Sequence, residues 1–586
     1  MKDKHPKYSN LEFAKDLWHF FRNYKREFIF FSFLLGIAYS LELVPAIILA
    51  KIIDFFWTDY ESLRVFYILL VIILGIEIFN TFTRHIGKYY LAIFSNKIQK
   101  HVKVESFEKI MEGDLLWHDK ENTGVKIQKI TEGEGAVGRF MSFYINKGLP
   151  LVINLVGVIV IFSFFSIKYS LLAITFVIFY LFVEIKMNKE LAKKTLEVKI
   201  AREEASGKVY EFSSNINIVK SLGIEKSSNI QIMGKEEKVF QTKKEKRKAT
   251  ARKWVAIQLV SSFFYILFIL LVGIDVSIGL LTVGSIIIYI DYVRRLRTQA
   301  LGTISNELEN LIDIKYSMSR MMGIYKEVPD IKEEGAKNLN AWNSINVRHL
   351  KFKYKEGGVL DDFNLNIKKG EKIGIVGKSG SGKSTFFKLL LKLYLPQKGM
   401  IYFDNKPITQ IKKDSLLKRI AIVPQETEVF NLSVKENIII SRPGRIDYKR
   451  YMEALKASKL DKVIYKLKNR DLSLIGEKGV RLSGGERQRL GIARAIYKDS
   501  DIIIFDEATS NLDYATENNI QKSIDKLKNK TLIVSAHRLQ TLKNMDKIIF
   551  IDKGKIIEQG TYEVLLKKRG EFYKLWKKQG AWKDDK

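Results

Sequence analysis

Residues 377–385 read Gly-Lys-Ser-Gly-Ser-Gly-Lys-Ser-Thr, directly after the apolar run Lys372–Val376 and before a helix-like segment that ends near Leu393. In such a strand–loop–helix context, glycines let backbone N–H groups turn inward around phosphate oxygens, and the helix N-terminus adds a partial positive charge. We therefore predict that this loop binds a nucleotide phosphate, with the Lys383 ammonium on the β- and γ-phosphates and the Ser384 hydroxyl on Mg²⁺. The residues expected to contact ATP here are Gly377, Lys378, Ser379, Gly380, Ser381, Gly382, Lys383, Ser384 and Thr385.

Two further motifs narrow the choice among nucleotide-binding proteins. Residues 482–486 read Leu-Ser-Gly-Gly-Glu, and the apolar run Ile502–Phe505 ends in Asp506 and Glu507. A carboxylate at a strand end can hold Mg²⁺, so Asp506 is predicted to be a metal ligand and part of the ATP site. The next residue faces the other way, which suits Glu507 to orient or deprotonate the attacking water.

In this order and spacing, the three motifs resemble those of the ATP-binding cassette (ABC) family. The resemblance implies that ATP, with Mg²⁺, is bound and hydrolysed between two cassette domains. It also implies that Ser483, Gly484, Gly485 and Glu486 contact the nucleotide held by the opposite subunit, although Glu486 stands where Gln is more usual. Because the chain has one phosphate loop and one such signature, a working site is expected to need two chains.

Five more positions are assigned through the same resemblance. Gln425 resembles the glutamine that touches Mg²⁺ and senses the membrane domain, and His537 resembles the switch histidine that contacts the γ-phosphate. Both would join the strand-end glutamate as catalytic residues. Tyr354 resembles the aromatic residue that stacks on adenine. For coupling between parts, Asp513 resembles the aspartate that links the two sites, and Glu477 resembles the loop through which exporters contact their coupling helices.

Six apolar segments precede these motifs, and they are joined alternately by short turns and by long charged links. Lys and Arg crowd the amino-terminal segment and both long links, so these parts and the carboxy-terminal domain are predicted to be cytoplasmic. The layout resembles that of exporter-type ABC proteins, in which each long link carries a coupling helix, here expected at Leu115–Glu121 and roughly at Glu211–Asn217. The six predicted spans are Phe28–Ala50, Val65–Phe82, Leu149–Ile167, Ser170–Ile185, Val255–Ile274 and Ile278–Val293.

Charges inside the predicted spans, such as Glu42, Glu77 and Asp291, are costly unless they face a cavity or a partner. Glu42 lies mid-span beside Pro45, where an unpaired carboxylate is costly in lipid. It either faces a cavity for cationic substrates or pairs with a cation on another helix, and the sequence leaves both interpretations open. Pro45 weakens the helix locally and is expected to permit a kink.

Composition excludes several classes of site and partner. The 586-residue chain has no cysteine, which excludes disulfides and thiolate metal sites. Its net charge of +33 is spread over single lysines, with no arginine-rich arm. Cytosol and anionic lipid headgroups are therefore the expected surroundings, and no nucleic-acid partner is expected. The amphipathic stretch Leu11–Phe21 is expected to lie along the membrane surface.

The predicted fold is multi-domain. A six-helix, all-α transmembrane domain with long cytoplasmic helical extensions is followed by an α/β phosphate-loop ATPase domain with a largely parallel sheet. The predicted divisions are an N-terminal cytoplasmic or interfacial segment at 1–27, the transmembrane domain at 28–320, a linker at 321–342 and the cassette domain at 343–586. The expected strands of the sheet are Lys372–Val376, Ile420–Val423, Ile502–Phe505, Thr531–Val534 and Lys547–Ile551.

The resemblance implies a half-transporter of the plasma membrane that exports its substrate by alternating access, driven by ATP. The substrate is expected to be a hydrophobic or amphipathic compound, such as a drug, a lipid or a peptide. The expected partners are a second identical or homologous chain and the surrounding lipids. Three alternatives remain open: a lipid flippase, one subunit of a heterodimer with a degenerate partner, and a cytosolic nucleic-acid-linked ATPase, which the six apolar spans disfavour.

Overall fold

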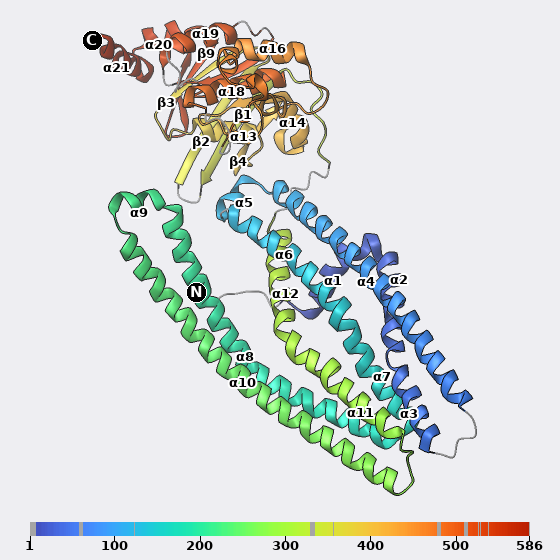
Figure 1. Ribbon diagram of the computed structural model, residues 1–586. Coiled ribbons are helices and arrows are strands. Elements are labelled where there is room, and N and C mark those ends of the chain that lie inside the picture. The colour runs from blue at the N-terminus through green and yellow to red at the C-terminus, as the bar shows by residue number, and fades with distance from the viewer. Residues whose placement is uncertain are drawn as a thin grey trace. The chain divides into compact units, whose positions relative to one another are not determined.

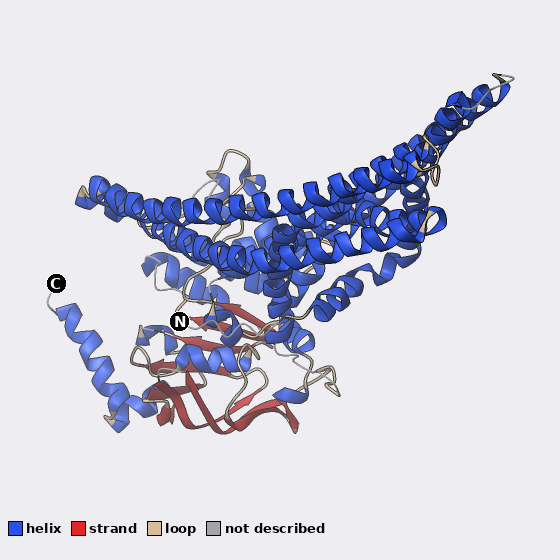
Figure 2. Cartoon of the chain, turned by 90° about the horizontal axis from the view of Figure 1, so that it is seen from below, coloured by secondary structure: helices blue, strands red, loops and turns tan. Residues whose placement is uncertain are grey.

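The computed structural model describes residues 8–57, 63–121, 123–328, 335–354, 357–476, 482–508, 514–525, 527, 529–536 and 538–584. The chain divides into two compact units. The first consists of Met1–Glu112 and Glu121–Val328, and the second consists of Gly113–Lys120 and Pro329–Lys586. Figure 2 shows the strands gathered in a single part of the molecule, and all of them lie between Ser344 and Gly560.

The described residues of the first unit form helices joined by turns. The helices α8 and α10 run side by side as a long pair with the short α9 at one end (Figure 1). The elements are α1 Asn10–Phe21, η1 Arg22–Tyr24, α2 Lys25–Leu41, α3 Val44–Trp57, α4 Arg64–Glu112, α6 Thr123–Phe143, η2 Tyr144–Gly148, α7 Leu149–Phe165, α8 Ile167–Ser214, α9 Ile216–Leu222, α10 Glu225–Ser277, α11 Ser285–Arg295, η3 Leu296–Leu301 and α12 Gly302–Glu327.

Five helical segments of the described residues are long and apolar enough to cross a membrane, judged by length and composition. They are Asn10–Trp57, Arg64–Glu112, Thr123–Phe165, Ile167–Ser214 and Glu225–Ser277. The predicted sixth span, Ile278–Val293, is not among them, so the count of six is not confirmed. Its first residues form a turn, and the helix that begins at Ser285 soon carries Asp291, which is paired with Arg295 (Oδ2–Nε 2.6 Å).

The first span breaks next to the proline, as the sequence predicts. Helix α2 ends at Leu41, a turn covers Glu42 and Leu43, and α3 begins at Val44. The Glu42 carboxylate pairs with the Arg84 guanidinium of α4. The ion pair matches the second of the two interpretations of Glu42, an interhelical partner.

The amphipathic N-terminal stretch forms α1 and packs on the protein. Ser9 caps the helix and exchanges hydrogen bonds with Glu12 in a capping box. Leu17, Phe20 and Phe21 are buried in a hydrophobic cluster with side chains of α2, α4, α6 and α12. One face of α1 is thus covered by protein.

The second unit contains two sheets (Figure 1). In the larger sheet the order is β10-β9-β3-β8-β7-β6, and neighbouring strands from β9 to β6 are parallel. The smaller sheet, β2-β1-β4-β5, is antiparallel. The strands are β1 Ser344–Tyr354, β2 Gly357–Lys368, β3 Lys372–Gly377, β4 Lys398–Phe403, β5 Lys406–Pro407, β6 Ile420–Val423, β7 Ile502–Asp506, β8 Thr531–Ser535, β9 Lys547–Asp552 and β10 Lys555–Gly560.

All five predicted strands are present and form the parallel part of the larger sheet. Their residues are almost entirely buried, as expected of parallel strands covered on both faces. The antiparallel sheet was not predicted. Its long strand β1 alternates buried and more exposed residues, but two exposed residues follow each other at Arg348 and His349, which weakens the period-2 signal.

The helices of the second unit are mostly short. They are α5 Leu115–Lys120, α13 Lys383–Leu390, η4 Ile408–Gln410, α14 Lys413–Arg419, α15 Val434–Ile439, α16 Tyr448–Ala457, α17 Asp461–Tyr465, η5 Arg470–Leu472, α18 Gly484–Lys498, α19 Tyr514–Asp525, η6 Leu539–Leu542, α20 Tyr562–Lys568 and α21 Glu571–Asp584.

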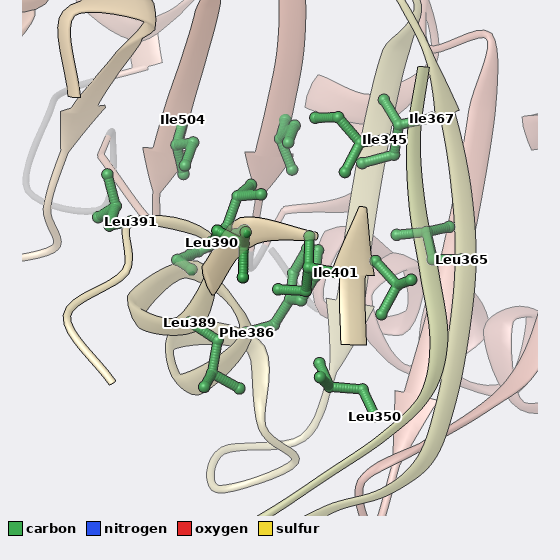
Figure 3. Close-up of a cluster of buried hydrophobic side chains, with 14 of the residues drawn as sticks. Ile345, Leu350, Leu365, Ile367, Phe386, Leu389, Leu390, Leu391, Ile401 and Ile504 are labelled. Carbon is green, nitrogen blue, oxygen red and sulfur yellow. The ribbon is translucent and has the colours of Figure 1, made fainter. Parts of the chain in front are cut away.

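The helix after the phosphate loop, α13, lies in the main hydrophobic cluster of the second unit (Figure 3). Phe386 and Leu390 of α13 are fully buried there. The same cluster contains Ile401 of β4 and Ile504 of β7, so α13 contacts side chains of both sheets. The phosphate loop is therefore held by a helix whose position is set by packing.

The two predicted coupling helices have different outcomes. The predicted Leu115–Glu121 is a short helix, α5, and Leu115 packs against the main cluster of the second unit. The predicted Glu211–Asn217 is wrong in its bounds, because α8 continues to Ser214 and the separate short helix α9 begins at Ile216. Asn215 interrupts the helical backbone there, and Gly223 ends α9 in the left-handed conformation.

Candidate nucleotide site

The phosphate loop joins β3 to α13 and contains glycines at positions where any other residue would be strained. Gly380 has φ +77° and Gly382 has φ +109°, in the left-handed region that L-residues disfavour. A Cβ atom on Gly382 would lie 2.8 Å from the Val359 carbonyl oxygen, and one on Gly377 would overlap the Ile551 carbonyl oxygen. The loop backbone is therefore packed tightly from behind and adopts a conformation of the kind that surrounds phosphate.

Lys383, the first residue of α13, is buried at the centre of this loop. Its Nζ atom donates to the carbonyl oxygens of Gly377 (3.0 Å) and Lys378 (3.3 Å). It also lies 3.5 Å from Glu507 Oε1, and both side chains are more than nine-tenths buried. The loop lysine and the predicted catalytic glutamate thus lie close together.

Two hydroxyl groups of the loop differ in their surroundings. The Ser381 Oγ atom is buried and has no hydrogen-bond partner among the described residues. Ser384, the predicted Mg²⁺ ligand, is exposed at the start of α13. A buried hydroxyl without a partner is costly unless a ligand or water supplies the missing bond. Ser381 therefore fits a phosphate oxygen.

Asp506 and Glu507 lie where β7 ends, and Ser535 at the end of the neighbouring strand β8 binds both. The Ser535 hydroxyl donates to Asp506 Oδ1 (2.8 Å), and the Glu507 N–H donates to Ser535 Oγ (3.1 Å) and to the Ser535 carbonyl oxygen (3.1 Å). Glu507 has φ +51°, so the chain turns sharply after the strand. The two adjacent carboxylates have different partners: Asp506 Oδ1 accepts from the Ser535 hydroxyl, and Glu507 Oε1 lies 3.5 Å from Lys383 Nζ.

Tyr354, at the end of β1, is anchored by aromatic neighbours. Its ring packs edge-on against Phe352 (centroids 5.1 Å apart) and Tyr394 (5.6 Å). Its hydroxyl lies 3.4 Å from Thr385 Oγ1, on the first turn of α13. These contacts hold the ring close to the phosphate-loop helix, and its stacking on adenine stays a prediction.

The signature residues begin α18. Ser483 is the N-cap residue: its Oγ accepts from the Glu486 N–H (3.3 Å), and the Ser483 N–H donates to Glu486 Oε2 (2.8 Å). This capping box explains a carboxylate at position 486, because Glu completes it as well as Gln does. Gly484 and Gly485 form the first turn, so their N–H groups are at the positive end of the helix.

Gln425 lies beside this helix, after β6. It is exposed, and its carbonyl oxygen accepts from Gln488 Nε2 of α18 (3.5 Å). Gln425, Leu482, Gly484 and further residues line a cavity of about 500 Å³. The structure therefore places Gln425 with the signature, and its contact with Mg²⁺ stays a prediction.

Three predicted site residues, Glu477, Asp513 and His537, lie outside the described residues. Glu42 belongs to the first unit, where it is paired with Arg84.

Sequence reasoning missed Arg494, a half-buried arginine that holds the segment after Gln425. Arg494 of α18 donates to the carbonyl oxygens of Glu428 (2.6 Å) and Asn437 (2.7 Å), and its guanidinium lies over the Phe430 ring. Burial lowers the pKa of the Arg494 guanidinium to about 10.

Ser535 was also missed as a site residue, although it precedes the predicted histidine by two residues in the sequence. A single polar residue closing the apolar strand Thr531–Val534, beside the strand that ends in two carboxylates, is the signal that could have found it.

Comparison with known families identifies both parts of the chain. The family model described as ABC transporter matches residues 360–510, and the model of the ABC transporter transmembrane region matches residues 28–299. The chain is therefore a membrane protein that belongs to the ABC transporter family, in the exporter arrangement that fuses the membrane region to the ATPase cassette. The family resemblance drawn from the motifs is confirmed.

Individual relatives agree with this assignment. Heavy metal tolerance factor 1 of Caenorhabditis elegans is 30% identical over 82% of this chain, and the match spans only 61% of that protein's length. The ATP-dependent lipid A-core flippase of Syntrophus aciditrophicus is 30% identical, over 85% of this chain and 82% of that protein. A solved structure of a bacterial Atm1-family ABC exporter with ATP bound shares the fold, with a TM-score of 0.84 and 23% identity over 94% of this chain and 99% of that one.

Proposed function

We propose that two such chains, identical or homologous, form an ATP-driven exporter with two composite ATP sites. The observation that carries the proposal is the geometry of one chain: a glycine cradle, a buried Lys383 and the Asp506–Glu507 pair lie together, whereas the signature begins a different helix, α18. Each chain supplies one phosphate loop and one signature. In each site the phosphate loop of one chain would face the Ser483–Glu486 signature of the other.

The loop residues fit the triphosphate of ATP. Lys383 can exchange its bonds to loop carbonyl oxygens for bonds to β- and γ-phosphate oxygens, which carry far more charge. The orphaned Ser381 hydroxyl gains its missing partner. The ring of Tyr354, fastened by its aromatic neighbours, offers a surface for adenine.

The chain also has two oxygen ligands that suit Mg²⁺. The Ser384 hydroxyl and the Asp506 carboxylate supply hard oxygen donors, and Mg²⁺ prefers a few such ligands together with phosphate oxygens and water. When bound, the ion neutralises charge that develops on the phosphates. Gln425 is proposed as a further contact with the ion.

Hydrolysis then depends on how the chain holds the attacking water. Glu507 orients it or accepts its proton, and His537 contacts the γ-phosphate. Lys383 stabilises the negative charge of the transferred phosphoryl group. Fixed cations act in phosphoryl transfer mainly through such electrostatic stabilisation. Asp513 couples the two sites of the dimer, and Glu477 contacts the coupling helices.

The membrane part is proposed to cross the plasma membrane six times, with both termini in the cytoplasm. The sixth crossing would use the helical run from Ser285 to Glu327. ATP drives the change between inward- and outward-facing states only through contacts that differ between them. The Glu42–Arg84 pair would then be a structural link between helices of one chain.

The substrate is proposed to be a hydrophobic or amphipathic compound. A lipid is a specific candidate, since a relative covering 85% of this chain is named an ATP-dependent lipid A-core flippase. The test is Mg²⁺-dependent ATP hydrolysis in lipid nanodiscs, with Glu507→Gln as control and lipids, peptides and drugs added in turn. Activity that the substitution abolishes supports the proposal, and stimulation by lipid alone identifies a flippase. A folded, ATP-binding chain with no activity alone would exclude a self-sufficient homodimer.

A further inference from the structure

Ser535 makes a continuous chain of hydrogen bonds between the two carboxylate residues of the site. A serine hydroxyl has one proton to donate and accepts through its lone pairs. Its single proton goes to Asp506 Oδ1 (2.8 Å), and its oxygen accepts the Glu507 N–H (3.1 Å). The chain therefore runs from the Glu507 N–H through the hydroxyl to the carboxylate, and each bond polarises the next.

The strand register makes this arrangement specific. Ser535 and Asp506 are partners in the parallel pairing of β8 with β7, at the last residues of both strands. Ser535 is 2% exposed, Asp506 7% and Glu507 8%. A carboxylate buried to this degree must be held by hydrogen bonds or by a cation, so the hydroxyl restricts how Asp506 can turn.

The hydroxyl is not needed to hold the backbone turn at Glu507. The Glu507 N–H also donates to the Ser535 carbonyl oxygen (3.1 Å), and this main-chain bond remains when the side chain is changed. Loss of the hydroxyl is thus expected to leave the fold in place and to free the Asp506 side chain. This separates a role in the site from a role in folding.

We propose that Ser535 is a positioning residue for ATP hydrolysis: it orients the Asp506 carboxylate toward Mg²⁺ and ties that orientation to the backbone of Glu507. The inference rests on the proposed function, in which Asp506 is the metal ligand and Glu507 acts on the water. Residues that orient a metal ligand typically change metal affinity or activity by roughly 10- to 100-fold when they are removed.

The first test measures metal binding without turnover. In the full chain carrying Glu507→Gln, Mn²⁺ binding with saturating ATP is followed by electron paramagnetic resonance, with and without Ser535→Ala. We expect Ser535→Ala to raise the dissociation constant for Mn²⁺ roughly tenfold. ATP affinity in EDTA should change by less than about twofold, because the phosphate loop is untouched. Unchanged Mn²⁺ affinity overturns the inference.

The second test separates the hydroxyl from the volume of the side chain. Ser535→Thr keeps the hydroxyl, and Ser535→Val has the shape of threonine without it. We expect the threonine variant to keep kcat within about threefold of the wild type and the valine variant to lose roughly tenfold in kcat with little change in the KM for ATP. Equal kcat values for the two variants overturn the inference.

A matched control is provided by Ser500, which lies two residues before β7 begins. It is also buried, and its hydroxyl donates to the Lys418 carbonyl oxygen (3.2 Å) rather than to a carboxylate. Ser500→Ala should leave Mn²⁺ affinity unchanged. Asp506→Asn distinguishes a failure of the role given to Ser535 from a failure of Asp506 as the metal ligand. If it weakens Mn²⁺ binding and Ser535→Ala does not, the inference alone fails; if Asp506→Asn has no effect, the proposed metal ligand fails and the inference with it.

Discussion

Each unit of the chain buries a lysine against a glutamate, and the two pairs are built differently. In the first unit Lys253 Nζ lies 2.7 Å from Glu184 Oε1, with exposed fractions of 4% and 2% for the two side chains. The lysine also donates to Asn188 Oδ1 and to the Ser305 carbonyl oxygen. These partners come from α8, α10 and α12, so the pair joins three helices and its polar groups are satisfied from within the protein.

In the second unit, Lys383 and Glu507 are farther apart, at 3.5 Å. Here the lysine depends on main-chain carbonyl oxygens of the glycine loop, the glutamate has φ +51°, and the Ser381 hydroxyl nearby has no partner among the described residues. Burial of charge is common to both pairs. Strain and an unsatisfied donor, found at only one of them, are what indicate a ligand site.

The largest expected effects come from replacing the two buried lysines. One replacement should mainly impair ATP binding and hydrolysis, and the other should mainly lower the stability of the protein. Lys383→Ala should lower ATP hydrolysis by more than about 100-fold and weaken ATP binding, because the phosphates lose a fixed cation. Lys253→Ala should instead destabilise the protein by about 3–5 kcal/mol, because Glu184 stays buried without its partner. ATP binding and thermal unfolding in nanodiscs measure the two effects.

A double variant serves as control for the structural pair. Replacing both charges, with Glu184→Gln and Lys253→Met, should recover much of the stability that Lys253→Ala loses. If Lys253→Ala weakens ATP binding as strongly as Lys383→Ala does, the distinction between a structural pair and an ATP-site pair is wrong.

The next largest expected effect is on ATP affinity and comes from changing a glycine of the phosphate loop (Gly377, Gly380 or Gly382). Gly382→Ala places a Cβ atom 2.8 Å from the Val359 carbonyl oxygen on a backbone with φ +109°, so the loop must move. We expect ATP affinity to fall roughly tenfold or more. Gly207, inside α8, has open space at its Cβ position, and Gly207→Ala should stabilise the protein by about 0.5–1 kcal/mol without changing ATP affinity. Equal ATP affinities of the two variants would contradict the assigned cradle.

Two capping boxes in the second unit test whether the signature does more than start a helix. Ser483 caps α18 and Ser433 caps α15, each with a glutamate three residues later. Ser433→Ala and Ser483→Ala should each cost about 1 kcal/mol of stability. Only Ser483→Ala should also lower the ATPase rate, since only Ser483 is proposed to contact nucleotide. If Ser433→Ala lowers the ATPase rate as much as Ser483→Ala does, the role of Ser483 is limited to capping the helix.

The smallest effect is the pH dependence of the α15 cap. Hydrogen bonds from the Ser433 hydroxyl and N–H lower the pKa of the Glu436 carboxyl below its usual value. A lowered folded-state pKa contributes stability above the unfolded pKa, and that stability is lost as the pH falls through the folded value. The stability gap between wild type and Ser433→Ala should therefore narrow as the pH falls from about 7 to about 3. A gap that widens toward low pH would contradict this cap.

The parts of the fold that sequence reasoning predicts well are those with strong local signals. The five parallel strands are short apolar runs, and the phosphate loop follows from its glycines. Segment bounds are less predictable. The turn at residues 278–284 continues an apolar run, so the start of the last long helix at Ser285 has no sharp signal.

Contacts between distant segments could not be predicted. Arg84, which pairs with Glu42, lies on another helix, and no local period connects the two. Ser535 and Asp506 meet only because β8 pairs with β7 in one register. The motifs predict which residues carry the chemistry, and the register and packing determine which residues hold them in place.

The central claim is that the phosphate loop of one chain faces the signature of another. Because the chain has no cysteine, a chain with Ser379→Cys and Ser483→Cys carries only these two thiols. On the Glu507→Gln background, a short bis-maleimide should join two chains into a covalent dimer when Mg²⁺ and ATP are added. Chains with either cysteine alone should join far less. Cross-linking that is independent of ATP, or equal in the single-cysteine chains, would contradict the composite site.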